Sequence, residues 1–216
     1  MARAVNYSWF ANAALAMEAE GYQFDRAGAV QTMPDTNPDP ARRNPNPIVA
    51  RNGGLIAKRR VELAEDNRLF RFAARKYLGA GGAALEPLLN SPWWMEEDRM
   101  VLLLDRARTA GVGLIEMARR QLALPADWTD CDIIVAVRPR AGLVLAAHAG
   151  PGLTAESGGE RRIIAHEAPH LFMDQMYIPG LGRHPVLAGQ GVANAAAWLE
   201  AARATSFDPA ARGFNP

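Results

Sequence analysis

The 216-residue sequence lacks several features, and each absence excludes a class of protein. A single cysteine, Cys131, rules out an intramolecular disulfide, and we expect it to be a small buried residue at the start of a strand. No apolar run approaches the roughly 18 residues that a membrane-spanning helix requires. A formal net charge of +1 provides no overall field for nucleic acid, so that partner is not indicated. Polar residues interrupt any secretory h-region near the start, so we expect a cytoplasmic protein, or one delivered into a target cell without a classical signal peptide.

Two common catalytic motifs are also missing from the sequence. No glycine-rich phosphate loop follows a strand-like run, and no G-x-S-x-G string marks a hydrolase nucleophile. No internal repeat is present, so repeat architectures are excluded.

A string typical of zinc peptidases does occur, at His166-Glu167-Ala168-Pro169-His170. In such enzymes the two histidines share one helix face, and the glutamate acts as the general base. Pro169 would break that helix, at a cost of roughly 3 kcal/mol. We therefore expect that His166 and His170 do not bind zinc together, and a zinc-dependent hydrolase remains an alternative.

Prolines divide the chain near residue 40. Five of them fall within residues 33–54, between asparagine and aspartate residues, and this composition predicts an extended arm without regular secondary structure. The sequence thus predicts two parts, an N-terminal helix with a proline-rich arm over residues 1–54 and a core domain over residues 55–216.

Helical patterns precede strand patterns along the chain. The Lys58-Arg59-Arg60 run indicates a solvated helix face, with a phosphate-binding or nucleic-acid patch as the alternative. Ser91 and Pro92 are typical of a helix start. We expect helices over residues 3–20, 55–66, 91–107, 114–124 and 192–203, and short strands over residues 133–137, 143–148, 163–164, 176–178 and 185–187. The predicted fold is α+β, a helical N-terminal half followed by a small, mainly antiparallel sheet of short strands.

Three short stretches, in this order, carry a family resemblance: Leu69-Phe70-Arg71, Ser91-Pro92-Trp93-Trp94 and Gln175-Met176-Tyr177-Ile178-Pro179. The chain resembles the ADP-ribosyltransferase toxins and related NAD-consuming toxins over residues 65–190. The resemblance implies an ADP-ribosyltransferase-like fold in which Arg71 holds an NAD phosphate and Gln175 occupies the catalytic position. It departs from the family's pattern in two ways, because Gln175 replaces the usual glutamate and no Ser-Thr-Ser strand is recognisable.

The chemistry of such a site can also be stated without the resemblance. Cleaving the nicotinamide–ribose bond requires an anchored diphosphate, a stacked aromatic ring and a polar group near the ribose. Arginine, aromatic and amide or carboxylate side chains meet these needs. The candidate residues are Arg71, Trp93, Trp94 and Tyr177 for binding NAD, and Gln175, Glu167 and Asp174 for catalysis, with no metal.

The function predicted from the sequence is an NAD-consuming, toxin-like bacterial effector that transfers ADP-ribose or hydrolyses NAD. NAD is then a substrate, and the further partners would be a protein target or a neutralising protein. The alternatives are a non-catalytic binding or assembly protein, supported by the proline-rich arm, and the zinc-dependent hydrolase.

Overall fold

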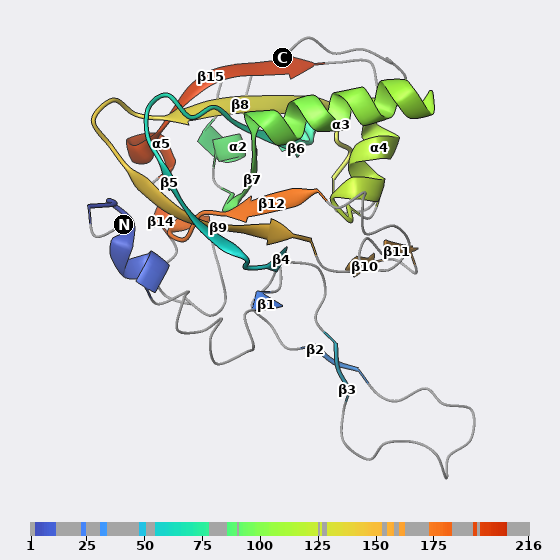
Figure 1. The fold of residues 1–216 in the computed structure, drawn as a ribbon, viewed down its shortest axis with the longest axis horizontal. Coiled ribbons are helices and arrows are strands. Elements are labelled where there is room, and N and C mark those ends of the chain that lie inside the picture. The colour runs from blue at the N-terminus through green and yellow to red at the C-terminus, as the bar shows by residue number, and fades with distance from the viewer. Residues whose placement is uncertain are drawn as a thin grey trace.

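The computed structural model describes residues 3–11, 23–24, 31–33, 48–50, 55–77, 86–89, 91–124, 126, 129–152, 155–157, 160–162, 173–182, 192–193 and 195–206. Most of these residues form a curled, fully antiparallel sheet with helices packed against it (Figure 1). In spatial order the seven strands of this sheet are β15 (Leu199–Ser206), β8 (Ile133–Pro139), β6 (Leu69–Ala73), β7 (Trp93–Glu96), β12 (Asp174–Tyr177), β9 (Leu145–Pro151) and β5 (Arg59–Leu63).

Short elements surround this sheet. The antiparallel pairs are β1 (Gln23–Phe24) with β4 (Leu55–Ile56), β2 (Gln31–Met33) with β3 (Ile48–Ala50), β10 (Ala155–Ser157) with β11 (Glu160–Arg162), and β13 (Leu181–Gly182) with β14 (Val192–Ala193). The helices are η2 (Arg75–Tyr77), α2 (Glu86–Leu89), α3 (Glu97–Ala110), α4 (Leu114–Gln121) and α5 (Ala195–Trp198).

Strand alternation gives the sheet two faces with different coverings. The inner face carries Leu69, Trp94, Ala149 and Met176, which belong to one hydrophobic cluster with α2 and α5. The outer face carries Phe70, Met95 and Ile134 over its middle strands, and these pack against α3 and α4 in a second cluster. The strand register places each residue on its face, since directly paired residues point to the same side of the sheet.

The long helix α3 forms because apolar residues recur on one side of it. Met100, Leu103, Leu104 and Ala107 are buried against the outer face, a spacing that fits one helix stripe. Gly111 ends the helix in the left-handed region, with φ of 65°, and its N–H is bonded to the carbonyls of Ala107 and Arg108.

The N-terminal segment, residues 3–11, covers the outer face where α3 and α4 do not reach. Residues 7–11 are helical, and Ala4 and Phe10 pack on Ala146 of β9. As a result β9 is buried at every position, with cover on both of its faces.

The predicted fold class is wrong. The described chain is mainly a curled antiparallel sheet, its longest helices lie in the middle of the sequence, and no helical N-terminal half exists among the described residues. Residues 55–66, predicted as a helix, contain β4 and β5. In β5 the residues Arg59, Val61 and Leu63 point to one side and Arg60 and Glu62 to the other, and pairing with β9 fixes this alternation.

Strand pairing also shortens one predicted helix, of which residues 97–107 are confirmed in α3, and replaces most of another. Trp93–Glu96 forms β7 between β6 and β12, so the helix predicted from Ser91 begins four residues after Trp93, at Glu97. The alanine-rich residues 192–203 form β14, the short α5 and the start of β15, which pairs with β8 along its length. The packing of a complete sheet outweighs the helix propensity of alanine, which amounts to less than about 1 kcal/mol per residue.

Other predicted elements are present. The strands β8, β9 and β12 and the helix α4 lie where the sequence predicts them, and Cys131 is buried two residues before β8. Within the proline-rich arm, Ile48–Ala50 pairs with Gln31–Met33, so the prediction of no regular structure is wrong for those residues. Residues 34–47, 163–164 and 185–187 lie outside the described residues, and the division at residue 54 stays a prediction.

Candidate functional site

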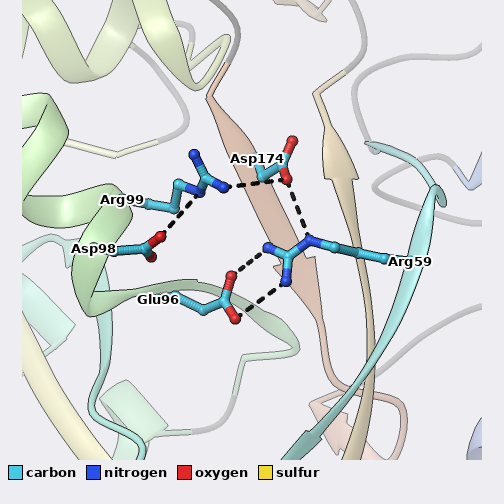
Figure 2. Close-up of polar contacts among 5 residues, drawn as sticks. All are labelled: Arg59, Glu96, Asp98, Arg99 and Asp174. Carbon is cyan, nitrogen blue, oxygen red and sulfur yellow. Dashed lines mark hydrogen bonds and ion pairs between the residues drawn. The ribbon is translucent and has the colours of Figure 1, made fainter.

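Charged side chains from three strands meet at one end of the inner face. Arg59 of β5 reaches across β9 to Glu96 of β7 and Asp174 of β12, as Figure 2 shows. All three lie on the inner face, because Arg59 pairs with Ala149, which pairs in turn with Met176. We call Arg59, Glu96 and Asp174 the charged cluster.

The geometry of the charged cluster joins one guanidinium to two carboxylates. Nη1 of Arg59 donates to Oε1 of Glu96 at 3.3 Å, its Nη2 donates to Oε2 of the same carboxylate, and its Nε donates to Oδ2 of Asp174 at 3.4 Å. The hydrogen bond to Glu96, with the charges of both carboxylates, raises the pKa of Arg59 against the opposing effect of burial. The side chains of Glu96 and Asp174 are 25% and 26% exposed, so both remain accessible to a ligand.

A second arginine approaches the same carboxylate from the first turn of α3. Nη2 of Arg99 lies 3.9 Å from Oδ2 of Asp174, and its Nε lies 3.6 Å from Oδ2 of Asp98 (Figure 2). The Nε atom is buried and makes no hydrogen bond within the described part of the chain. Asp98 is 68% exposed and marks the solvent side of this group.

The predicted phosphate-binding residue Arg71 lies deeper on the inner face. Its Nη1 donates to the carbonyl of Leu88 at 2.9 Å, and its guanidinium carbon lies 5.6 Å from the centre of the Trp94 ring. Trp94 is itself buried and donates from Nε1 to the carbonyl of Ser91 at 2.6 Å. Burial lowers the pKa of Arg71 to about 10, which leaves the side chain charged at neutral pH.

The other predicted strand residues point to the outer face. Nε2 of Gln175 donates to the carbonyl of Leu122, just after α4, at 2.8 Å. Trp93 and Tyr177 are cross-strand partners whose rings meet edge to face, with centres 5.0 Å apart, and burial raises the pKa of Tyr177. The catalytic role of Gln175 and the NAD-binding roles of Trp93 and Tyr177 stay predictions.

The structure therefore separates the predicted site into two groups. Arg71, Trp94 and Asp174 share the inner face, whereas Gln175, Trp93 and Tyr177 lie on the outer face. Arg71 and Gln175 are thus on opposite sides of the sheet. Glu167, with His166 and His170, lies outside the described residues, and within the described ranges no group of three or more potential metal ligands is present.

Sequence reasoning missed Arg59, Glu96 and Arg99 as site residues. The sequence indicates a helix face at Lys58-Arg59-Arg60, and Glu96 falls inside the helix that it predicts over residues 91–107. The useful signal was the alternation of Arg59, Val61 and Leu63, which places one arginine on the apolar side of a strand.

No protein-family model, curated protein or solved structure matches this chain at a significant level. Across the described residues, no helix has the length and apolar character needed to cross a membrane.

Proposed function

We propose that this protein cleaves the nicotinamide–ribose bond of NAD, as a hydrolase or an ADP-ribosyl transferase, with Asp174 as its principal catalytic carboxylate. One observation supports this most: Asp174 and Glu96 extend from neighbouring strands onto the face that also carries Arg71 and Trp94. That face combines carboxylates, arginines and an aromatic ring, which are the groups the reaction requires.

The proposed chemistry depends on charge developing at the ribose. The bond from C1′ to the nicotinamide nitrogen breaks, its electron pair leaves with nicotinamide, and the ribose becomes cationic until water or an acceptor nucleophile adds to C1′. A carboxylate near C1′ stabilises this cation and can accept the proton of the attacking group. Asp174 supplies that charge, which the neutral amide of Gln175 cannot.

Arginines of the same region can anchor the diphosphate. Arg59 and Arg99 both lie beside Asp174, and a guanidinium presents paired donors to phosphate oxygens. In this proposal Arg59 exchanges a carboxylate for the diphosphate when NAD binds, which frees negative charge for the ribose.

The experiment is nicotinamide release from NAD by the purified protein. Asp174→Asn should lower turnover by on the order of a hundredfold or more, because it removes the charge and preserves the shape. Gln175→Ala should have a much smaller effect. Asp98→Asn is the matched control, since it removes an exposed carboxylate next to Arg99 and should leave turnover within about twofold. A Gln175→Ala loss equal to that of Asp174→Asn would return the catalytic role to Gln175.

A second candidate is a non-catalytic binding or assembly protein. It is favoured by the internal partners of two predicted site residues, because Arg71 donates to the Leu88 carbonyl and Gln175 to the Leu122 carbonyl. No nicotinamide release, together with no NAD binding by calorimetry, would remove the enzyme proposal and leave this candidate.

The proposal extends to where the activity would be used. A toxin-like effector of this kind would act in the cytoplasm, its own or that of a target cell, on NAD alone or on a protein target. Its producer would need a neutralising partner protein. Nicotinamide release in lysate, with and without candidate acceptor proteins, would separate hydrolysis from transfer.

A further inference from the structure

The N-terminal segment is held on the outer face of β9 by a small number of directional contacts. The N–H of Val5 donates to the carbonyl of Val144 at 2.9 Å. Nδ2 of Asn6 donates to the carbonyls of Ala146 and Pro179, each at 2.8 Å, and its Oδ1 accepts from the N–H of Ala146 at 2.7 Å. These contacts satisfy a buried amide completely and fix the segment in register with β9.

His148 makes the next contact along the strand. Its ring stacks on Phe10 with centres 4.2 Å apart and an interplanar angle of 3°. His148 is only 2% exposed, and its Nε2 has no hydrogen-bond partner within the described residues.

Within the described part of the chain, the charged and titratable groups that face His148 come from the two neighbouring strands and the residue before β5. Arg60 of β5 is its direct cross-strand partner and lies with its guanidinium carbon 5.9 Å from the centre of the Phe10 ring. Tyr177 of β12 is the partner on the other side, Glu62 lies two residues after Arg60 on the same face of β5, and Lys58 comes just before that strand. The charged group paired directly with His148 is therefore Arg60, a cation, and its charge disfavours a protonated imidazole.

We propose that the N-terminal segment is an acid-released cover over β9, and that protonation of His148 beneath Phe10 releases it while the sheet stays folded. The geometry supports this because a proton on Nε2 would be buried with no acceptor among the described residues and with Arg60 as its cross-strand neighbour. When the segment leaves β9, water can reach the imidazolium and hydrogen-bond to it.

The direction of the effect follows from the two protonation equilibria. In the docked state burial lowers the pKa of His148 to about 4, with Arg60 adding to this and the Phe10 backbone opposing it. In the released state the imidazole has its ordinary pKa of about 6.5. The released state therefore binds more protons between pH 6.5 and pH 4, and the ratio of released to docked molecules rises by about a hundredfold over that range.

The neighbouring tryptophans provide a direct measurement of release. Trp9 lies on the N-terminal segment with its ring centre 5.4 Å from that of Trp198, whereas Trp94 is buried in the inner-face cluster. In protein labelled with 5-fluorotryptophan, fluorine NMR follows each signal from pH 7.5 to pH 4, with Trp9→Phe assigning the Trp9 signal. We expect the Trp9 signal to move towards its solvent-exposed position on acidification while the Trp94 signal stays.

Three variants decide the role of His148. His148→Phe retains a ring for the stack and cannot be protonated, so its Trp9 signal should stay docked down to pH 4. His148→Gln serves the same purpose if the phenylalanine variant does not fold. Asn6→Ala keeps His148 and should move the release to higher pH, because it weakens docking alone.

Several results would overturn the proposal. A Trp9 signal that stays in place from pH 7.5 to pH 4, or that moves equally in the His148 variants, would contradict the role of His148. A Trp94 signal that shifts together with that of Trp9 would mean that acid unfolds the whole protein, and release would not exist as a separate event.

Discussion

At the scale of single residues, Arg59 connects strands that are distant in the sequence. It joins β5 to Glu96 and Asp174 on two other strands of the sheet, through partly buried contacts. Arg59→Met should lower the free energy of unfolding by about 1 kcal/mol, because it leaves two carboxylates facing each other, although solvent screens part of the effect. Arg68→Met is the matched control, since Arg68 and Glu97 form a more exposed pair that should contribute close to nothing.

Urea unfolding at low and high salt tests this comparison. The destabilisation by Arg59→Met should shrink as salt screens the carboxylates from each other. Equal effects of Arg59→Met and Arg68→Met would show that the charged cluster is no more important to stability than a surface ion pair.

Cys131 gives a second prediction at this scale. It is fully buried, and burial raises the pKa of its thiol to about 11. Because the thiolate is the reactive form, the folded protein should react with Ellman's reagent at pH 8 at least a hundredfold more slowly than a free thiol does. Full reaction should appear in denaturant. Rapid labelling of the folded protein would mean that Cys131 is exposed by frequent local opening.

At the scale of elements, alanine substitution at two glycines with positive φ allows the cost of backbone strain to be compared with the cost of steric crowding. Gly111, with φ of 65°, ends α3 in open space, whereas a Cβ on Gly180, with φ of 91°, would lie 2.9 Å from the Trp198 ring and 3.2 Å from Trp9. Gly111→Ala should cost about 1 kcal/mol, the usual penalty of the left-handed region. Gly180→Ala should cost clearly more, because it also displaces two packed indoles.

Thermal unfolding of the two glycine variants side by side provides the measurement. A Gly180→Ala variant no less stable than Gly111→Ala would show that the turn after β12 yields easily, with Trp9 and Trp198 moving together.

The same scale explains what the sequence could predict. Ile133–Pro139 and Leu145–Pro151 carry apolar runs that indicate strands whatever surrounds them, and the gap of five residues between these strands contains Gly142, a typical turn residue. Trp93–Glu96 and Leu199–Ser206 carry no such signal, because they become strands through pairing with β6, β12 and β8. Pairing between distant segments is set by the assembled sheet, which local propensity does not contain.

The prediction of the candidate site was incomplete because the sequence does not give the strand register. Arg71, Gln175 and Asp174 could all be identified as candidates from residue type. Their faces depend on strand register, and a shift of one residue exchanges the two faces. Asp174 and Gln175 are neighbours in sequence and point to opposite sides, so residue type alone could not decide between them.

At the scale of the whole molecule, β12 connects the two parts of the seven-stranded sheet. It pairs with β7 on one side and β9 on the other, and Met176 is 1% exposed in the inner-face cluster. Met176→Ala should cost about 3 kcal/mol and leave a single cooperative transition, because both parts of the sheet lose the same contact. Val101→Ala on α3, at a side chain 44% exposed, should cost less than about 1 kcal/mol.

Urea unfolding followed by both tryptophan fluorescence and far-ultraviolet circular dichroism tests the cooperativity. Coincident transitions in both variants are expected. Two separate transitions in Met176→Ala would mean that the strands on either side of β12 fold independently.

The position of β12 also matters while the chain is being made. Both neighbours of this strand are translated before it, and β12 itself begins only at Asp174. Until the ribosome has released that segment, β5 with β9 and β8 with β6 and β7 are separate sheets with open edges. An effector of the proposed kind would therefore gain its complete inner face, and any activity there, only after the residues of β12 have been translated.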